Sequence, residues 1–247
     1  MLALRLLAVV VPGVLYATAG QHRSVTRPQA CMFYGGLLLL CSALVGPLEN
    51  RADQLQSAHM AQHLVLITAA PILLLLGRPE RALDWMPRPI RIALGRRWTH
   101  IPPAAAFAVH VALLTFWHLP GPYDAALRSE GLHALEHASF FGSAIALWYV
   151  VLAPVTAPGL RPAARIPYLV AMSVVGGCIG AVLTFSAAPL YDSYAHAANA
   201  LDDQQLAGLL MWIPGGLIYM GMGAILFIRW LRDAETRADR EVVWQRT

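Results

Sequence analysis

The sequence predicts an all-α integral membrane protein, a polytopic bundle of seven transmembrane helices with its N-terminus outside and its C-terminus in the cytoplasm. Two observations predict this class. First, 57% of the 247 residues are hydrophobic and only 13% are charged, about half the charged share of a typical soluble protein. Second, seven separate stretches approach the roughly 20 apolar residues that a spanning helix needs. They leave no room for a soluble domain, so residues 1–247 form one predicted transmembrane domain.

The seven predicted spans cover residues 2–19, 30–48, 59–77, 101–119, 132–153, 166–186 and 206–231. Helix-breaking or polar residues separate them. Gly46-Pro47 marks the end of the second span, Arg78-Pro79 the end of the third and Pro120-Gly121-Pro122 the end of the fourth. Pro158-Gly159 separates the fifth span from the sixth, and residues 232–247 form a predicted cytoplasmic tail.

The first span, residues 2–19, permits a second interpretation. It ends in Ala17-Thr18-Ala19, which resembles a signal-peptidase site, so the stretch can be read as a cleaved leader. Cleavage would start the mature chain outside at Gly20 and reverse every later connection. Six arginines between Arg78 and Arg97 would then lie outside, against the positive-inside rule. We therefore expect this span to be retained.

The arginines predict the orientation of the bundle. Fifteen of the eighteen lie in the connections after the first, third and fifth spans or at the C-terminal end. The opposite side holds only Arg5, Arg51 and Arg128, and residues 187–205 carry three aspartates and no arginine. Because short cytoplasmic loops carry the positive excess, the C-terminus is predicted to be cytoplasmic. Arginines spread between apolar runs also argue against a nucleic-acid-binding face.

Histidines gather at the predicted outer side. The third and fifth spans each begin with a pair at spacing i, i+4, which places two imidazoles on one helix face with Cβ atoms about 5–6 Å apart. Such pairs can bind one metal ion. The alternative is that the histidines only hydrogen-bond between helices, the interpretation we adopt for the mid-membrane His110. The outer histidines are the candidate ligands His59, His63, His133, His137 and His118, with His196 in the last outer loop.

Other side chains at this side are candidates for supporting roles. Met60 and Met211 offer thioethers to Cu(I), although methionine in an apolar helix usually fills the core. Carboxylates that orient imidazoles are available at Glu136, Asp124 and Asp192. At the entry to the last span, gating or helix capping is expected of Asp203, Gln204 and Gln205. The cysteines lie away from the outer side, which leaves an imidazole site suited to copper, zinc or haem iron.

Three alternatives to copper remain open. The residues His133 to His137 match H-x-x-E-H, the inverted zinc-peptidase motif, which would make the protein a zinc-dependent intramembrane hydrolase. A bare five-residue pattern is weak, and such an enzyme also needs a third ligand and a substrate cleft. In a haem-binding redox protein, His63 and His137, or His110 together with another helix, would supply the axial ligands. An assembly scaffold would bind no cofactor.

Four sequence blocks resemble the multi-pass CtaG family of cytochrome c oxidase assembly factors. They are Ala58 to His63, Thr115 to Pro120, His133 to Trp148, and Asp203 to Trp212. In this order they are quite specific, and the resemblance covers roughly residues 30–230. It implies a protein of the bacterial inner membrane, not an enzyme, that matures a haem–copper oxidase. The expected role is to hold copper in the periplasm-facing histidine cluster, with oxidase subunits or a periplasmic copper chaperone as partners.

Overall fold

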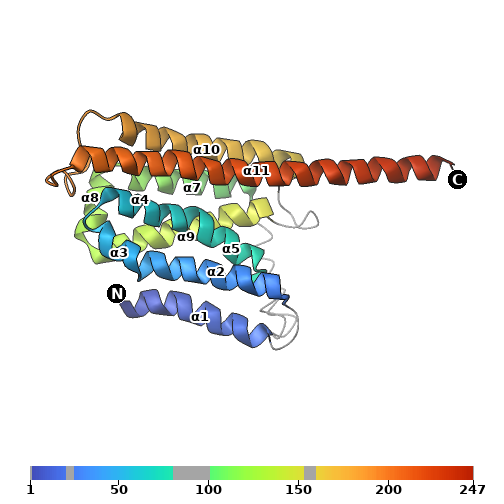
Figure 1. The fold of residues 1–247 in the computed structure, drawn as a ribbon, viewed down its shortest axis with the longest axis horizontal. Coiled ribbons are helices and arrows are strands. Elements are labelled where there is room, and N and C mark those ends of the chain that lie inside the picture. Colours follow the sequence, from blue (N-terminus) through green and yellow to red (C-terminus); the bar gives the residue numbers. More distant parts are fainter. Residues whose placement is uncertain (1, 21–24, 80–100, 153–159, 247) are drawn as a thin grey trace.

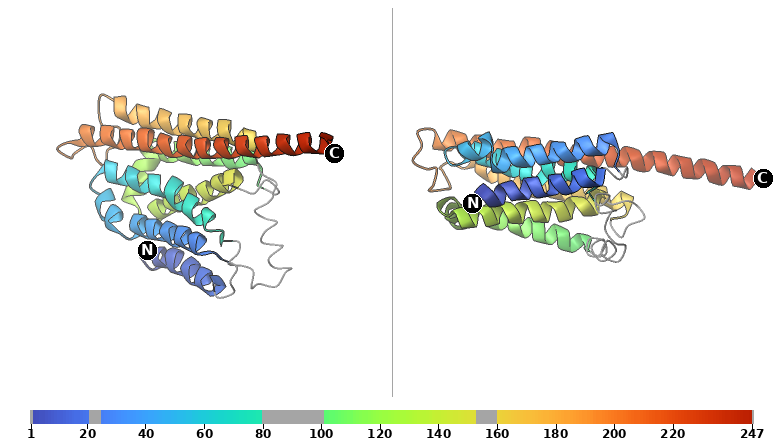
Figure 2. Two further views of the ribbon diagram at one scale, coloured as in Figure 1. Left: turned by 45° about the vertical axis from the view of Figure 1, so that its right-hand side comes forward. Right: turned by 90° about the horizontal axis from the view of Figure 1, so that it is seen from below.

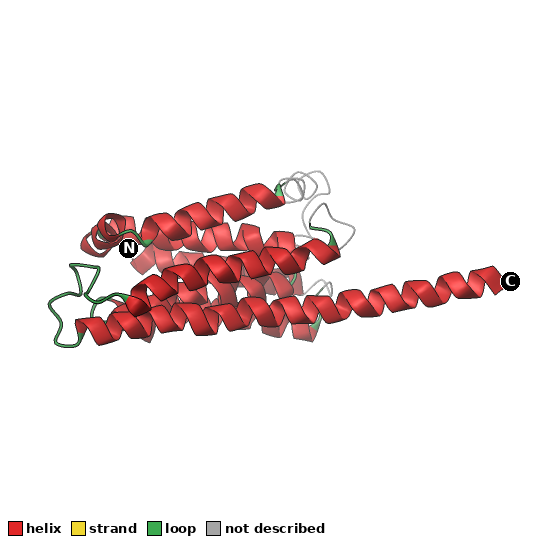
Figure 3. Ribbon diagram, turned by 90° about the horizontal axis from the view of Figure 1, so that it is seen from above, coloured by secondary structure: helices red, strands yellow, loops and turns green. Residues whose placement is uncertain are grey.

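A computed structural model describes residues 2–20, 25–79, 101–152 and 160–246, and all regular structure in these ranges is helical (Figure 1, Figure 3). The predicted all-α class is therefore confirmed. The elements are α1 (Leu2–Gly20), α2 (Arg27–Leu44), α3 (Pro47–Ala52), α4 (Gln56–Leu64), the π-helix η1 (Val65–Ala69), α5 (Ala70–Leu76), α7 (Pro103–Trp117), α8 (Pro120–Arg128), α9 (Glu130–Leu152), α10 (Pro162–Phe185) and α11 (Ala200–Arg246).

Five helical stretches in the described ranges are long and apolar enough to cross a membrane: Arg27–Ala52, Gln56–Leu76, Glu130–Leu152, Pro162–Phe185 and Ala200–Thr236. A sixth span results if α7 and α8, bent by 75°, are counted together. The apolar part of α1, Arg5–Thr18, is shorter. All seven predicted stretches have a helical counterpart, but the number that cross the membrane stays a prediction.

The helices alternate in direction, so the ends of the bundle differ. The start of α1, the short helices α3 and α8, and the loop of residues 186–199 lie at one end, which we call the N-terminal end (Figure 1). The C-terminal part of α11 projects from the other end. His22, His100 and most of the arginines between Arg78 and Arg97 lie outside the described residues, so the orientation in the membrane stays a prediction.

The break expected at Pro120-Gly121-Pro122 is present, and a short helix that was not expected begins at it. Pro120 is the first residue of α8, where its fixed φ suits a helix and its missing N–H loses nothing. Leu119, the residue before this proline, is extended with φ −70° and ψ 141°, as pre-proline residues favour. The chain therefore turns by 75° between α7 and α8 at His118 and Leu119.

The third predicted span contains a π-helix that was not predicted from the sequence. Pro71 has no N–H to donate to the carbonyl of Ile67, four residues earlier, and its ring would crowd that oxygen in a regular α-helix. The wider π-turn of η1 relieves the crowding. The indole Nε1 of the buried Trp148, on α9, donates to the freed Ile67 oxygen at 2.8 Å. This bond ties the helix that carries His59 and His63 to α9.

Close contacts hold α11 to α10 and α1 to α2. On α11, Gly208 lies against α10 so closely that a Cβ atom there would be 2.5 Å from the Gly180 oxygen. At the opposite edge, α1 packs on α2 through stacked rings of Tyr16 and Phe33, 3.8 Å between centroids (Figure 2). Tyr16 also donates to the Gly77 oxygen.

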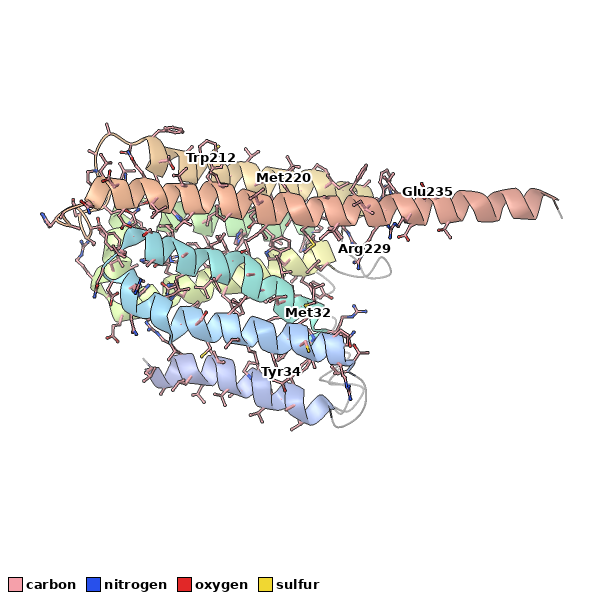
Figure 4. The ribbon with its side chains drawn as sticks, in the orientation of Figure 1. Met32, Tyr34, Trp212, Met220, Arg229 and Glu235 are labelled. Carbon is pink, nitrogen blue, oxygen red and sulfur yellow. The ribbon has the colours of Figure 1, made fainter. Side chains whose placement is uncertain are left out.

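The surface around the sides of the bundle is largely apolar, as a lipid-facing surface should be. Met32, Tyr34, Trp212 and Met220 lie at the surface of the bundle and are all 39–52% exposed (Figure 4). Large apolar side chains are exposed along most helices. The polar groups described below are buried between the helices instead. This inversion of the pattern of a soluble protein supports the membrane assignment.

Candidate metal centre

Three helices bring the predicted histidines together near the N-terminal end. Two come from α4, two from α9, and one follows the end of α7. Their ring centroids lie 4.2–6.2 Å apart in the pairs that touch. None is more than 8% exposed. The histidine cluster consists of His59, His63, His118, His133 and His137, with the carboxylate of Glu136 beside it.

The tightest part of the cluster has the dimensions of a metal site. Ligand atoms of His59, His63, Glu136 and His137 all lie within 4.8 Å of one another. The Nε2 atoms of His59 and His63 face each other at 2.8 Å. Two nitrogens bound to one ion at 2.0–2.1 Å in tetrahedral geometry lie about 3.3 Å apart. A small rotation of either ring would admit the ion.

A haem fits this space poorly. It needs a flat slot between two axial imidazoles, whereas aromatic side chains pack against the rings here. The ring of Phe140 lies 4.8 Å from that of His63, and Tyr123 stacks on His59 at 5.3 Å. The residues present therefore fit a single ion better than a macrocycle.

Many polar atoms of the cluster have no hydrogen-bond partner among the described residues. They are Nδ1 of His63, Nε2 of His118 and His133, both ring nitrogens of His137 and both carboxylate oxygens of Glu136. Burying such a group unpaired costs about 1–3 kcal/mol, and about 90% of buried polar groups in proteins are paired. So many unpaired atoms at one place make the cluster a candidate ligand site.

Hydrogen bonds orient two of the imidazoles for binding. The hydroxyl of Tyr194 donates to the Ala52 oxygen, so its oxygen is left to accept from Nδ1 of His59 at 3.1 Å. This arrangement leaves Nε2 of His59 with a lone pair that faces the cluster. In the same way, Nδ1 of His118 donates to the Leu114 oxygen at 2.7 Å and leaves Nε2 free. Such outer hydrogen bonds fix the tautomer of metal-binding histidines.

Asp203 stabilises the helix that carries His59 and His63. Its carboxylate accepts from the backbone N–H groups of Gln56 and Ser57, at 2.6 and 3.3 Å, and from the Ser57 hydroxyl. These are first-turn N–H groups of α4, which lack partners within the helix. The prediction that Asp203 caps its own helix, which begins at Ala200, is therefore wrong. Its side chain caps α4, a helix about 150 residues earlier in the chain.

Gln204 and Asp124, two other polar residues expected at the site, hold the loop of residues 186–199, whereas Gln205 contacts α10. Gln204 accepts from the Leu190 N–H at 2.6 Å and donates to two carbonyls of α10 and the loop. The backbone carbonyl of Gln205 accepts from Thr184 at 3.5 Å. Asp124 accepts from the N–H and the hydroxyl of Ser193. Asp124 was expected to orient an imidazole, and it anchors the loop instead.

The remaining candidates lie around the cluster. Met60 packs among Tyr123, Tyr191 and other apolar side chains, and Met211 belongs to the main core. Asp192 and His196 are exposed on the loop. His110 donates to or accepts from the Ser143 hydroxyl at 2.8 Å, as expected for an interhelical histidine.

Two tyrosines at this end contact the cluster and were not predicted from the sequence. Tyr194 contacts His59, and the Tyr191 hydroxyl donates to the His118 oxygen at 2.9 Å. Burial raises the pKa of both phenols far above the usual 10, so they stay neutral donors. Both lie in an irregular loop, where no periodicity marks a residue as part of a site.

Comparison with known proteins gives one match. The model of a protein family, cytochrome c oxidase caa3 assembly factor (Caa3_CtaG), matches residues 10–233. Searches of the curated proteins and of the solved structures found no match. The matched range includes every residue of the histidine cluster. Since it covers nearly the whole chain, this protein belongs to the Caa3_CtaG family of cytochrome c oxidase assembly factors.

Proposed function

We propose that the protein serves oxidase assembly by binding copper at His59, His63, Glu136 and His137 and passing it on. One observation carries the proposal: ligand atoms within 4.8 Å of one another belong to a buried cluster whose nitrogens and oxygens are largely unpaired. Imidazole suits copper, zinc and iron. A haem–copper oxidase needs copper during its maturation, and membership in the assembly-factor family therefore favours copper among these metals.

A transfer protein must release its metal, and the cluster has features that suit release. His118 lies 6.1 Å from His63, and His133 lies 5.2 Å from His59, measured between ring centroids. The cluster therefore offers more imidazoles than a four-coordinate ion needs. An ion can change ligands one at a time, which favours exchange over permanent retention.

The positive-inside rule supports a periplasmic position for the cluster. Arginine-poor connections accompany the N-terminal end, which indicates that this end lies outside the inner membrane. Copper would then be received and released on the periplasmic side. Oxidase subunits or a periplasmic copper chaperone are the partners that this position suits.

Metal analysis of the detergent-purified protein tests the proposal. We expect about one copper per chain after loading with Cu(I), and loss of binding in the double variant His63→Ala/His137→Ala, which removes two imidazoles. The control is His110→Ala, which removes a buried histidine from the same bundle but not from the cluster. A Soret absorption band would support haem, preferential retention of zinc would support the hydrolase, and the absence of any metal would support a scaffold. Each of these results would contradict copper handling.

A further inference from the structure

A cavity of about 880 Å³ lies at the N-terminal end beside the histidine cluster. Residues from α1, α3 and its following turn, α8, α9 and the loop of residues 186–199 line it. Several of them, including Asp53, Glu130, Asp192 and His196, are exposed, so the cavity is open to solvent.

The charge of the cavity favours cations. Its walls carry the carboxylates of Glu49, Asp53, Glu130 and Asp192 and the guanidinium groups of Arg5 and Arg128. Arg5 forms an ion pair with Glu49, so the remaining acids outnumber the remaining arginine. A recess lined by an excess of one charge concentrates ions of the opposite charge and speeds their arrival.

His133 connects the cavity with the buried cluster. It lines the cavity, yet it is only 6% exposed, and its Nε2 has no hydrogen-bond partner in the described part of the chain. Its ring centroid lies 4.2 Å from that of His137 and 5.2 Å from that of His59. An ion bound to His133 is therefore one ligand exchange away from the four-residue site.

We infer that this cavity is the vestibule through which copper enters and leaves, and that His133 is the ligand that carries the ion between the vestibule and the buried site. The inference rests on the proposed function. Carboxylates and the exposed His196 collect the cation, and His133 replaces them as a ligand before His59 or His137 replaces His133. Each step breaks one coordination bond as another forms, so the oxidation state of the ion does not change.

Exchange kinetics of the full-length protein in detergent test this inference. Cu(I) alone is the probe, and its release to a coloured Cu(I) chelator is followed by stopped flow. His133→Ala should slow both loading and release about tenfold, because the intermediate ligand is lost. If His133 were simply one more ligand of the site, the variant would release copper faster than the wild type, and this result would overturn the inference.

A second variant tests the vestibule through exposed side chains only, which avoids a folding defect. Asp53→Asn/Glu130→Gln/Asp192→Asn should slow loading about tenfold, within the range known for electrostatic focusing, and make it less sensitive to salt. Asp202→Asn is the matched control, since Asp202 is an exposed acid of the same end that does not line the cavity. Loading as fast as in the wild type would overturn the vestibule while the metal site stands. A wild-type protein that binds no copper would overturn the proposed function itself.

Discussion

Replacing Asp203 should loosen the helix that carries His59 and His63. The carboxylate accepts from two first-turn N–H groups of α4 and from a serine hydroxyl. Loss of a capping side chain costs about 0.5–2 kcal/mol, and hydrogen bonds to a charged group contribute about 1.5–3 kcal/mol each. Because Asp203 is only partly buried and water can replace it, we take about 1–2 kcal/mol for Asp203→Ala.

Hydrogen–deuterium exchange measures this loss where it occurs. A change of 1–2 kcal/mol corresponds to a factor of about 5–30 in a local opening equilibrium. Amide exchange in residues 56–60 should therefore accelerate by that factor in Asp203→Ala. Asp203→Asn should restore most of the protection, because asparagine is also a good capping residue.

Asp202→Ala is the control for the Asp203 experiment. Asp202 precedes Asp203 in the first turn of α11, but it is exposed and lies outside the hydrogen bonds to α4. Removing it changes the charge of this end equally. Unchanged exchange in Asp203→Ala, or equal acceleration in both variants, would refute the capping argument.

Three further predictions concern packing and pH. Gly208→Ala would place a methyl group 2.5 Å from a carbonyl oxygen of α10; it should destabilise the bundle by about 1–3 kcal/mol, seen as a lower midpoint of denaturation. Trp148→Phe leaves the Ile67 carbonyl unpaired, which costs about 1–3 kcal/mol and should speed amide exchange in residues 65–72. Copper occupancy should fall at acid pH, because only neutral imidazole binds metal; equilibrium dialysis over a series of pH values measures it, and occupancy that stays constant down to the pH at which the protein unfolds would contradict histidine ligation.

Features with a local signal in the sequence were predictable. Apolar stretches and the glycine and proline residues between them predicted the helices, because a buried backbone in a membrane must form its own hydrogen bonds. The spacing of His59 and His63, and of His133 and His137, placed each pair on one helix face. The positions of these pairs at matching ends of two spans also predicted that they lie close together.

Features that depend on contacts distant in the chain were not predictable. Asp203 and Gln56 are 147 residues apart, and nothing near either of them reveals the bond. Tyr194 contacts His59 from a loop without periodicity. The position of Pro71 was readable, but the indole of Trp148 that donates to the Ile67 oxygen lies on another helix. Sequence patterns identify the faces of helices, and the partners of those faces come from the packed structure.

The π-helix also sets the rotational phase of the third span. A residue of an α-helix advances by about 100° around the axis, so one extra residue in a turn rotates everything after it by that amount. Before η1, α4 packs against α11; after η1, α5 packs against α2. Deleting one residue from Val65–Ala69 would produce a regular helix of nearly the same length and hydropathy. It would turn the histidine pair away from α9 while α5 kept its place, so a deletion too small to alter the predicted spans would dismantle the candidate site.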